Sequence, residues 1–278
     1  MGNILKSYFY TPDYDIEEIY LYNFDNESKK IILSNLKNYK KLKKLHCQRC
    51  NLTKLSNLPN SLIELICCNN NLTKLPNLPD SLIYLVCSNN NLKELPNLPY
   101  SLTELICFSN DLEELPNLPN SLIELWCQSN NLTKLPNLPN LLKYLYCSNN
   151  NLIKLPYLPN SLSNLLCNKN NLTELPYLPD LLNTLYCFSN NLIELPDLPN
   201  SLTYLDCNDN NLSYSNLEIK TVNETNLKNR IIKRMKLLNR TLLLENSARI
   251  SMCPKRIKRL VDNLEIDFFD GSFDTLTY

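Results

Sequence analysis

Twelve cysteines and a single histidine are the residues of this sequence with the most versatile chemistry. Cys47 and Cys50 form a C-x-x-C pair, and His46 stands next to it. A structural zinc site usually combines two such pairs, but the sequence holds no second one. One histidine also excludes a two-histidine metal centre, and any histidine-based acid–base catalysis would depend on His46 alone. We therefore expect no metal ion and no cofactor.

The spacing of the cysteines indicates an architecture and not a reactive site. Nine of them recur every twenty residues, at Cys47, Cys67, Cys87, Cys107, Cys127, Cys147, Cys167, Cys187 and Cys207. A fixed period of this length is typical of a repeat array. Each cysteine is expected to fill an interior slot as a small apolar side chain, together with Cys50. Disulfides are not expected, because neighbouring parallel strands hold their side chains further apart than a bridge allows.

One repeat unit shows which elements position these cysteines. Reading from Leu62, the pattern is L-x-x-L-x-L-x-x-N-x-L, with Cys67 in the third apolar slot and Asn70 at the asparagine position. The alternation around Leu65 predicts a short strand with one buried face. The asparagine is expected to turn inward and satisfy backbone groups. The following Leu-Pro-x-Leu-Pro predicts an extended or polyproline-like return leg with no helix.

The twenty-residue unit and its Leu-Pro-x-Leu-Pro-x-Ser-Leu junction, as in Leu75 to Leu82, carry a family resemblance. They resemble the leucine-rich repeats of bacterial effectors of the YopM/IpaH type, and similar arrays occur in giant-virus proteins. The resemblance covers the repeat region only, and cysteine stands where the effectors usually carry valine. It implies an α/β leucine-rich-repeat solenoid, or horseshoe, with a parallel concave sheet, an extended convex side and helical caps.

Three regions follow from this pattern. Residues 1–41 are expected to form an N-terminal cap, with a degenerate strand within 16–24 and a helix from Asp25 or Asn26 to about Asn38 that buries Ile31 and Ile32. Nine repeats occupy 42–217, and 218–278 is expected to form a helical C-terminal cap. Zero net charge hides a strong segregation. The array (51–219) holds seven bases and fifteen acids, whereas residues 220–260 hold twelve bases and two acids.

The concave face is the candidate binding surface. The residue between the second leucine and the cysteine points away from the core, yet seven of these nine residues are apolar or aromatic. An apolar centre with aromatic enrichment and polar margins is typical of a protein interface. The alternative is that these residues stack across neighbouring strands and only stabilise the sheet. The predicted partner-binding residues are Ile66, Tyr84, Ile106, Phe108, Trp126, Tyr144, Tyr146, Tyr186, Phe188 and Tyr204.

Two features near the C-terminus suggest other functions, namely Cys253 and the basic segment at 220–260. Some relatives of the effector class carry a C-terminal ubiquitin-ligase domain, which would make Cys253 a candidate nucleophile. About 60 residues are too few for that domain, and Cys253-Pro254-Lys255 lacks the acidic residue that its motif requires. The basic C-terminal segment suggests nucleic-acid binding, but no aromatic platform accompanies it. A part in substrate recognition for a ubiquitin-pathway enzyme and nucleic-acid binding remain the alternatives.

The sequence therefore predicts a non-catalytic protein-interaction scaffold. Its partner is a protein bound on the concave face and centred on Trp126, Tyr146 and Tyr186, with no small-molecule substrate. Two glycines exclude a phosphate-binding glycine-rich loop, and no apolar run is long enough to cross a membrane. Without a secretory signal, we expect a cytoplasmic protein, either in its own cell or, as a viral or effector protein, in a host cell.

Overall fold

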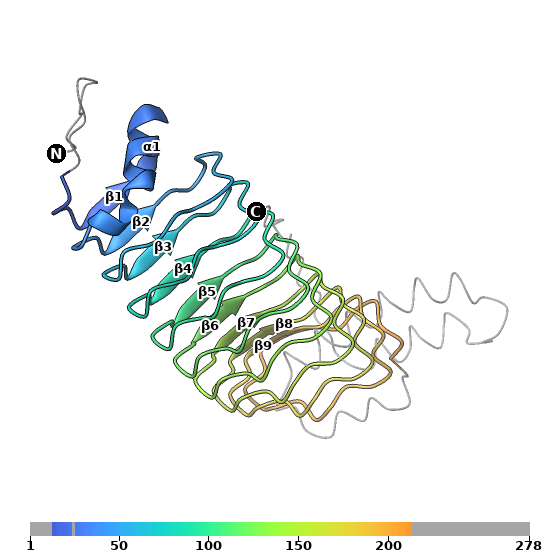
Figure 1. The fold of residues 1–278 in the computed structure, drawn as a ribbon. Coiled ribbons are helices and arrows are strands. Elements are labelled where there is room, and N and C mark those ends of the chain that lie inside the picture. Colours follow the sequence, from blue (N-terminus) through green and yellow to red (C-terminus); the bar gives the residue numbers. More distant parts are fainter. Residues whose placement is uncertain (1–12, 24–25, 213–278) are drawn as a thin grey trace, which may run out of the picture. The chain divides into compact units, whose positions relative to one another are not determined.

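A computed structural model describes residues 13–23 and 26–212 of the chain. Its main element is a parallel sheet of ten strands that follow one another in sequence order (Figure 1). The strands are β1 (Glu18–Tyr20), β2 (Lys44–His46), β3 (Glu64–Ile66), β4 (Tyr84–Val86), β5 (Glu104–Ile106), β6 (Glu124–Trp126), β7 (Tyr144–Tyr146), β8 (Asn164–Leu166), β9 (Thr184–Tyr186) and β10 (Tyr204–Asp206). From β2 onward each strand starts twenty residues after the last. The predicted solenoid with a parallel sheet is confirmed.

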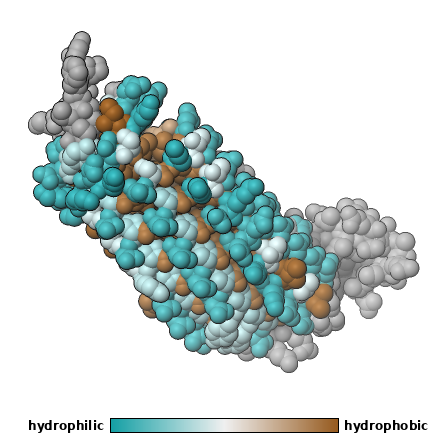
Figure 2. All heavy atoms as spheres, viewed as in Figure 1, coloured by the Kyte–Doolittle hydropathy of each residue, from teal (hydrophilic) through white to brown (hydrophobic). Residues whose placement is uncertain are grey.

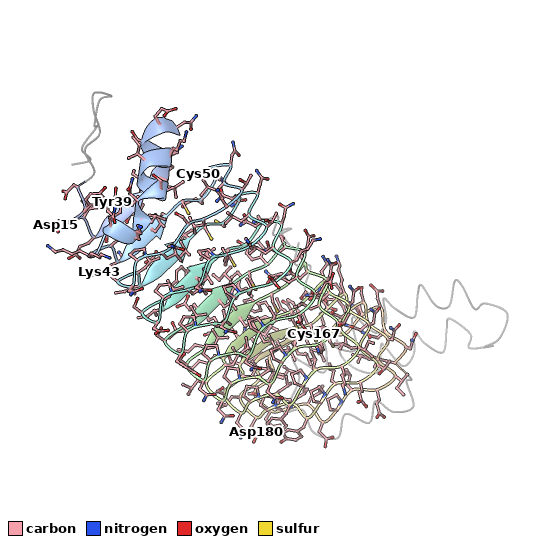
Figure 3. All side chains as sticks on the ribbon, viewed as in Figure 1. Asp15, Tyr39, Lys43, Cys50, Cys167 and Asp180 are labelled. Atoms are coloured by element: carbon pink, nitrogen blue, oxygen red, sulfur yellow. The ribbon has the colours of Figure 1, made fainter. Side chains whose placement is uncertain are left out.

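The strands pair in a constant register that aligns the repeats residue by residue. Leu65 pairs with Leu85, and Leu85 pairs with Leu105. These leucines are fully buried, as are the cysteines two positions further along, such as Cys67. Cys167, another of this column, lies within the stack of coils (Figure 3). Because side chains alternate along a strand, the leucine and cysteine columns fill the interior, and the described cysteines are free thiols.

The repeated asparagine links consecutive coils from inside. The Asn130 side-chain amide donates to the carbonyl oxygens of Cys107 (3.2 Å) and Cys127 (3.1 Å). Its Oδ1 accepts from the backbone N–H of Leu112, 3.1 Å away. Asn70 and Asn210 repeat this arrangement at either end of the array. The inward asparagine is thus confirmed, and it satisfies backbone groups that burial would otherwise leave unpaired.

The residue immediately before each repeated interior asparagine has a left-handed backbone conformation. Asn89 and Ser109 have φ of 52°, and Lys169 has φ of 54°. Glycine normally takes such positions because it has no Cβ, yet both glycines of the chain lie outside the described residues. The conformation is held by pairing between coils, for example by the Asn89 N–H on the carbonyl oxygen of Phe108 at 2.9 Å.

The return legs are extended, and the described residues of these legs contain no helix. Proline supplies no N–H, and in most coils a serine hydroxyl donates to the preceding coil instead, whereas Leu141 and Leu181 stand at this position in two coils. The Ser81 hydroxyl lies 2.6 Å from the carbonyl oxygen of Leu62 and 2.7 Å from that of Asn60. The repeat is also visible on the surface, where rows of hydrophobic residues alternate with rows of hydrophilic ones (Figure 2).

The N-terminal end combines a strand with short helices. β1 pairs with β2, and it is followed by η1 (Leu21–Asn23), α1 (Asn26–Ser34) and η2 (Leu36–Asn38). The prediction of a single helix to about Asn38 is therefore wrong at its C-terminal end. The Asn35 side-chain amide donates to the carbonyl oxygen of Ile31 at 2.8 Å and competes with the backbone hydrogen bonds of the helix. Ile32 is buried as expected, but Ile31 is 37% exposed. The predicted C-terminal cap lies outside the described residues.

Candidate protein-binding face

Three columns of side chains form the face of the sheet that points away from the interior, which we call the concave face. They hold the residue that begins each strand, the residue that ends it and the residue two positions later. The first column is Glu18, Lys44, Glu64, Tyr84, Glu104, Glu124, Tyr144, Asn164, Thr184 and Tyr204. The second is Tyr20, His46, Ile66, Val86, Ile106, Trp126, Tyr146, Leu166, Tyr186 and Asp206. The third is Gln48, Cys68, Ser88, Phe108, Gln128, Ser148, Asn168, Phe188 and Asn208.

All ten residues predicted from the sequence fall in these columns. Three tyrosines belong to the first column, namely Tyr84, Tyr144 and Tyr204. Five residues belong to the second, namely Ile66, Ile106, Trp126, Tyr146 and Tyr186. Phe108 and Phe188 belong to the third. Nine of the ten are half-buried and Tyr204 is 50% exposed, so the face is a packed surface and not a row of free side chains.

Stacking between neighbouring coils contributes to this partial burial at the centre of the face. The rings of Trp126 and Tyr146 meet edge to face, with centroids 4.7 Å apart and planes at 70°. Such pairs contribute about 1 kcal/mol beyond their buried area. The stacking stabilises the sheet, as the alternative interpretation requires. It also holds the aromatic side chains in place before any partner arrives, which lowers the entropic cost of binding.

Two polar atoms at the centre of the face have no partner in the described part of the chain. Trp126 Nε1 and Gln128 Oε1 are both buried without a hydrogen bond. A buried polar atom left unpaired costs about 1–3 kcal/mol. The two atoms belong to one coil, beside the Trp126–Tyr146 stack. A repeat pattern does not predict these unpaired atoms, because they depend on how side chains from adjacent coils cover each other.

Two carboxylates oppose each other near the same place. Glu104 pairs directly with Glu124 in the register of β5 and β6, and the ion pairs of the described residues involve neither of them. Burial, and then the charge of Glu124, raise the pKa of Glu104. Burial and the neighbouring Glu104, Glu64 and Glu124 also raise the pKa of Tyr84. Like charges on facing strand positions are destabilising, so the centre of the first column carries uncompensated negative charge.

The N-terminal end of the face is different, because its carboxylates have a cation or a hydrogen-bond partner within the chain. Lys44 Nζ lies 2.9 Å from Glu18 Oε1, and the Tyr20 hydroxyl donates to Glu18 Oε2 at 2.9 Å. The hydrogen bond from Lys44 lowers the pKa of Glu18. His46 Nε2 lies 2.7 Å from Glu64 Oε1, and its ring meets that of Tyr20 at 4.6 Å. Charged groups at this end have partners within the chain, although Gln48 Oε1 of the third column is buried there without a hydrogen bond in the described residues.

The cysteines do not form a reactive or metal-binding centre in the described region. No group of three histidine, cysteine or acidic side chains there is placed to hold a metal ion. Cys47 is buried as expected, whereas Cys50 is only half-buried and its thiol lies 3.3 Å from the carbonyl oxygen of Gln48. Cys68 is half-buried in the third column. Cys253 lies outside the described residues.

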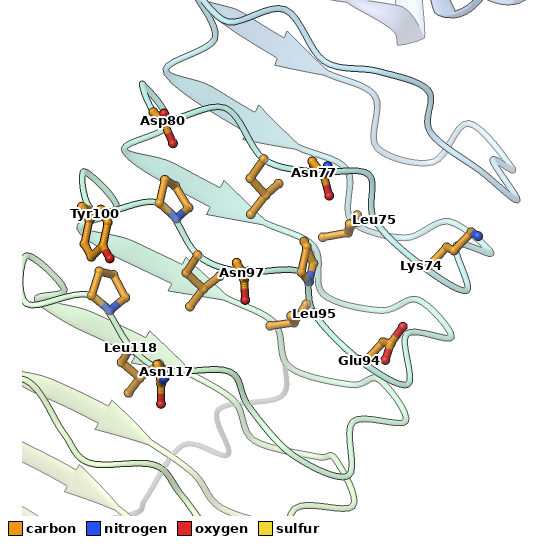
Figure 4. Close-up of a pocket in the computed structure, with 15 residues that line it drawn as sticks. Lys74, Leu75, Asn77, Asp80, Glu94, Leu95, Asn97, Tyr100, Asn117 and Leu118 are labelled. Carbon is orange, nitrogen blue, oxygen red and sulfur yellow. The ribbon is translucent and has the colours of Figure 1, made fainter.

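A groove of about 920 Å³ lies on the return legs of neighbouring coils (Figure 4). A row of repeated asparagines, Asn77, Asn97 and Asn117, crosses it, and Tyr100 stands at one end. The groove is lined mainly by repeated leucine, proline and asparagine positions. It is a consequence of the spacing between return legs and does not indicate a catalytic site. Among the described helices, none has the length and hydrophobicity that a membrane span requires.

Comparison with known proteins identifies the repeat class. No protein-family model matches the chain, and no curated protein matches it. Among solved structures, YopM from Yersinia enterocolitica WA-314 is 42% identical, with a TM-score of 0.60, over 63% of this chain and 39% of that chain. YopM, a leucine-rich effector protein from Yersinia pestis, is 34% identical, with a TM-score of 0.51, over 66% of each chain.

The match thus spans well under half of the first YopM chain and just under two thirds of the second. The leucine-rich repeat domain of APL1B, 23% identical with a TM-score of 0.55 over 63% of this chain and 57% of that chain, shares the fold. The resemblance to giant-virus repeats stays a prediction. The coil architecture, the inward asparagine and the sequence identity of 42% and 34% to the two YopM chains all indicate the same repeat class. The chain is a leucine-rich-repeat protein whose repeat region is similar to that of the YopM effectors.

Proposed function

We propose that the chain is a non-catalytic scaffold that binds a protein partner on its concave face, centred on Trp126, Tyr146 and Tyr186. The observation that carries this proposal is the unsatisfied centre of the face. A preformed aromatic stack lies beside a buried indole N–H that has no acceptor in the described residues. Aromatic anchors surrounded by polar margins are the usual hot spots of protein interfaces.

The charge of the face supports a protein over a nucleic acid. The first column holds Glu64, Glu104 and Glu124 without an intervening base, and carboxylates repel phosphate groups. We therefore assign no nucleic acid to this face. The effector-like repeats support action in the cytoplasm of a host cell as part of the same proposal. A role for Cys253 or for the basic segment at 220–260 stays a prediction, because both lie outside the described residues.

The test compares aromatic pairs on opposite sides of the coils. A chain with Trp126→Ala and Tyr146→Ala is used beside a control with Tyr157→Ala and Tyr177→Ala, which removes exposed tyrosines of the return legs. Each buried anchor contributes on the order of 2 kcal/mol. Quantitative capture from host-cell lysate is expected to lose its specific partner more than tenfold with the first variant only. Circular dichroism verifies that both variants fold.

Two results would contradict the proposal. In one, the concave-face variant retains every protein that the unmodified chain captures. In the other, the return-leg variant loses the partner and the concave-face variant keeps it.

A further inference from the structure

We propose that the concave face takes a basic amphipathic helix from its protein partner, lying across the strands along the stack of coils. This inference deepens the proposed function and rests on it. The apolar side of the helix would lie on the second column, and its lysine or arginine side chains would lie on the first. Three features of the face lead to this partner: its charge, its apolar length and its dimensions.

The charge of the face lies on one side only. From β3 to β6 the first column holds three carboxylates and Tyr84, whereas the third column is uncharged, with Cys68, Ser88, Phe108 and Gln128. Glu64 is paired with His46, which leaves Glu104 and Glu124 facing each other without a cation in the described chain. Bases from a partner would remove this repulsion. A complementary segment therefore carries positive charge along one edge.

The apolar part of the face is long and continuous. The second column carries no formal charge over seven consecutive strands, from Ile66 to Tyr186. With strands about 4.8 Å apart, this column is roughly 29 Å long. Trp126 Nε1 at its centre has no acceptor within the described residues. The matching segment is therefore apolar along its middle for about 20 helical residues, which rise 1.5 Å each.

The dimensions of the face favour a helix over an extended strand. A helix repeats its apolar face about every 5.4 Å, close to the 4.8 Å spacing of the coils. Alternate residues of an extended strand are roughly 6.6 Å apart, so they match the spacing of the coils less well than a helix does. The first and third columns are four residues apart, or about 13 Å across, which fits a helix 10–12 Å in diameter.

The experiment selects peptides from a displayed random library against the immobilised full chain. The unmodified chain is expected to enrich peptides with several lysine or arginine residues and apolar residues at i, i+3, i+4 and i+7. Binding of the best peptide is then measured through the fluorescence anisotropy of a dye on the peptide, because Trp126 is the single tryptophan of the chain and one variant removes it. Glu104→Gln with Glu124→Gln is expected to weaken this binding about tenfold at low salt, and added salt should weaken binding to the unmodified chain.

A matched control removes two carboxylates elsewhere. Glu113→Gln with Glu114→Gln changes exposed acids of a return leg by the same total charge, and it should leave binding within about twofold if the effect is local. Equal weakening by both charge variants would overturn the inference, since it would indicate attraction to net charge alone.

Failure of the inference and failure of the proposed function give different results. Enriched peptides that are acidic or neutral, or whose apolar residues alternate as in a strand, would overturn the helix if their binding still requires Trp126 and Tyr146. The scaffold function would then stand. If no enriched peptide loses binding with Trp126→Ala and Tyr146→Ala, both proposals fail.

Discussion

The two faces of the same ten strands differ in how completely their polar groups are satisfied. On the interior face the eight coils from β3 to β10 carry the same leucine, cysteine and asparagine, and Asn130 hydrogen-bonds backbone groups of two coils. On the concave face Trp126 Nε1 and Gln128 Oε1 are buried without a partner in the described chain, and Glu104 opposes Glu124. This difference assigns stability to the interior face, and it is the basis for our proposal that the concave face binds another molecule.

The same contrast exists within the concave face. Its N-terminal end pairs Glu18 with Lys44 and His46 with Glu64, so those groups gain little from a partner. The centre, around Trp126, lacks such pairs in the described residues. A cationic partner at the centre would relieve the opposed carboxylates of Glu104 and Glu124, and this supports the proposed binding site beyond the aromatic residue types by themselves.

The largest expected difference between the two faces is in thiol reactivity. Burial raises the pKa of Cys147 from 9.0 to about 12, which lowers its reactive thiolate fraction about a thousandfold near pH 8. Burial likewise raises the pKa of Cys67 well above the usual range, whereas its neighbour Cys68 lies half-buried on the concave face. We expect iodoacetamide to label Cys68 in the folded chain and to leave Cys67 and Cys147 unlabelled, as followed by peptide mass spectrometry.

Unfolding in urea provides the control for this labelling, because all cysteines should then react at similar rates. Labelling of Cys67 in the folded chain as fast as Cys68 would mean that the interior face opens readily, and the contrast between the faces would be lost.

The next largest effect is on stability and compares two amides of one coil. Asn130→Ala leaves the Leu112 N–H unpaired. It also removes one of two amide donors from the carbonyl oxygens of Cys107 and Cys127, which keep Asn110 and Asn150, and the expected cost is about 2 kcal/mol. Gln128→Ala, two residues away, removes a buried oxygen that has no partner in the described chain. The relief of this unpaired atom offsets the lost side-chain packing, so the free energy of unfolding should fall by less than about 0.5 kcal/mol. Urea unfolding followed by circular dichroism measures both. Similar losses for the two variants would contradict the assignment of stability to the interior face.

The smallest expected effect separates the centre of the concave face from its N-terminal end. Glu104→Gln removes the repulsion from Glu124 and should stabilise the chain by about 0.5 kcal/mol at pH 7. Because burial and Glu124 raise the pKa of Glu104, the folded chain binds this proton more tightly than the unfolded chain. The contribution of Glu104 to the free energy of unfolding of the unmodified chain therefore rises as the pH falls from neutral through the raised pKa of Glu104. The advantage of the variant should shrink between pH 7 and about pH 5.

Glu64→Gln is the matched change at a compensated position. It removes the carboxylate that faces His46 at 2.7 Å, so it should lower stability slightly where Glu104→Gln raises it. The urea midpoints of both variants, measured side by side at pH 7 and at about pH 5, test this difference in direction. A shift in the same direction for both variants would remove the distinction between the two ends of the face.

Much of the fold followed from the twenty-residue period. The spacing of Cys67 and Cys87 predicted the coil length, and the alternation around Leu65 predicted which side chains are buried. The same alternation placed all ten candidate residues on the concave face. The period did not predict the left-handed Ser109 or the end of α1 at Ser34. These depend on hydrogen bonds to other chain segments or on local competition, which a repeat pattern does not contain.

The sequence by itself determined the architecture, because one unit repeated nine times has few ways to bury its leucines except by stacking on its neighbours. It also determined which columns point outward, since side chains alternate along a strand. Only the tertiary structure decided how well each outward group is satisfied. The burial of Trp126 Nε1 without a partner in the described chain and the opposition of Glu104 and Glu124 arise between coils, where residues twenty positions apart meet.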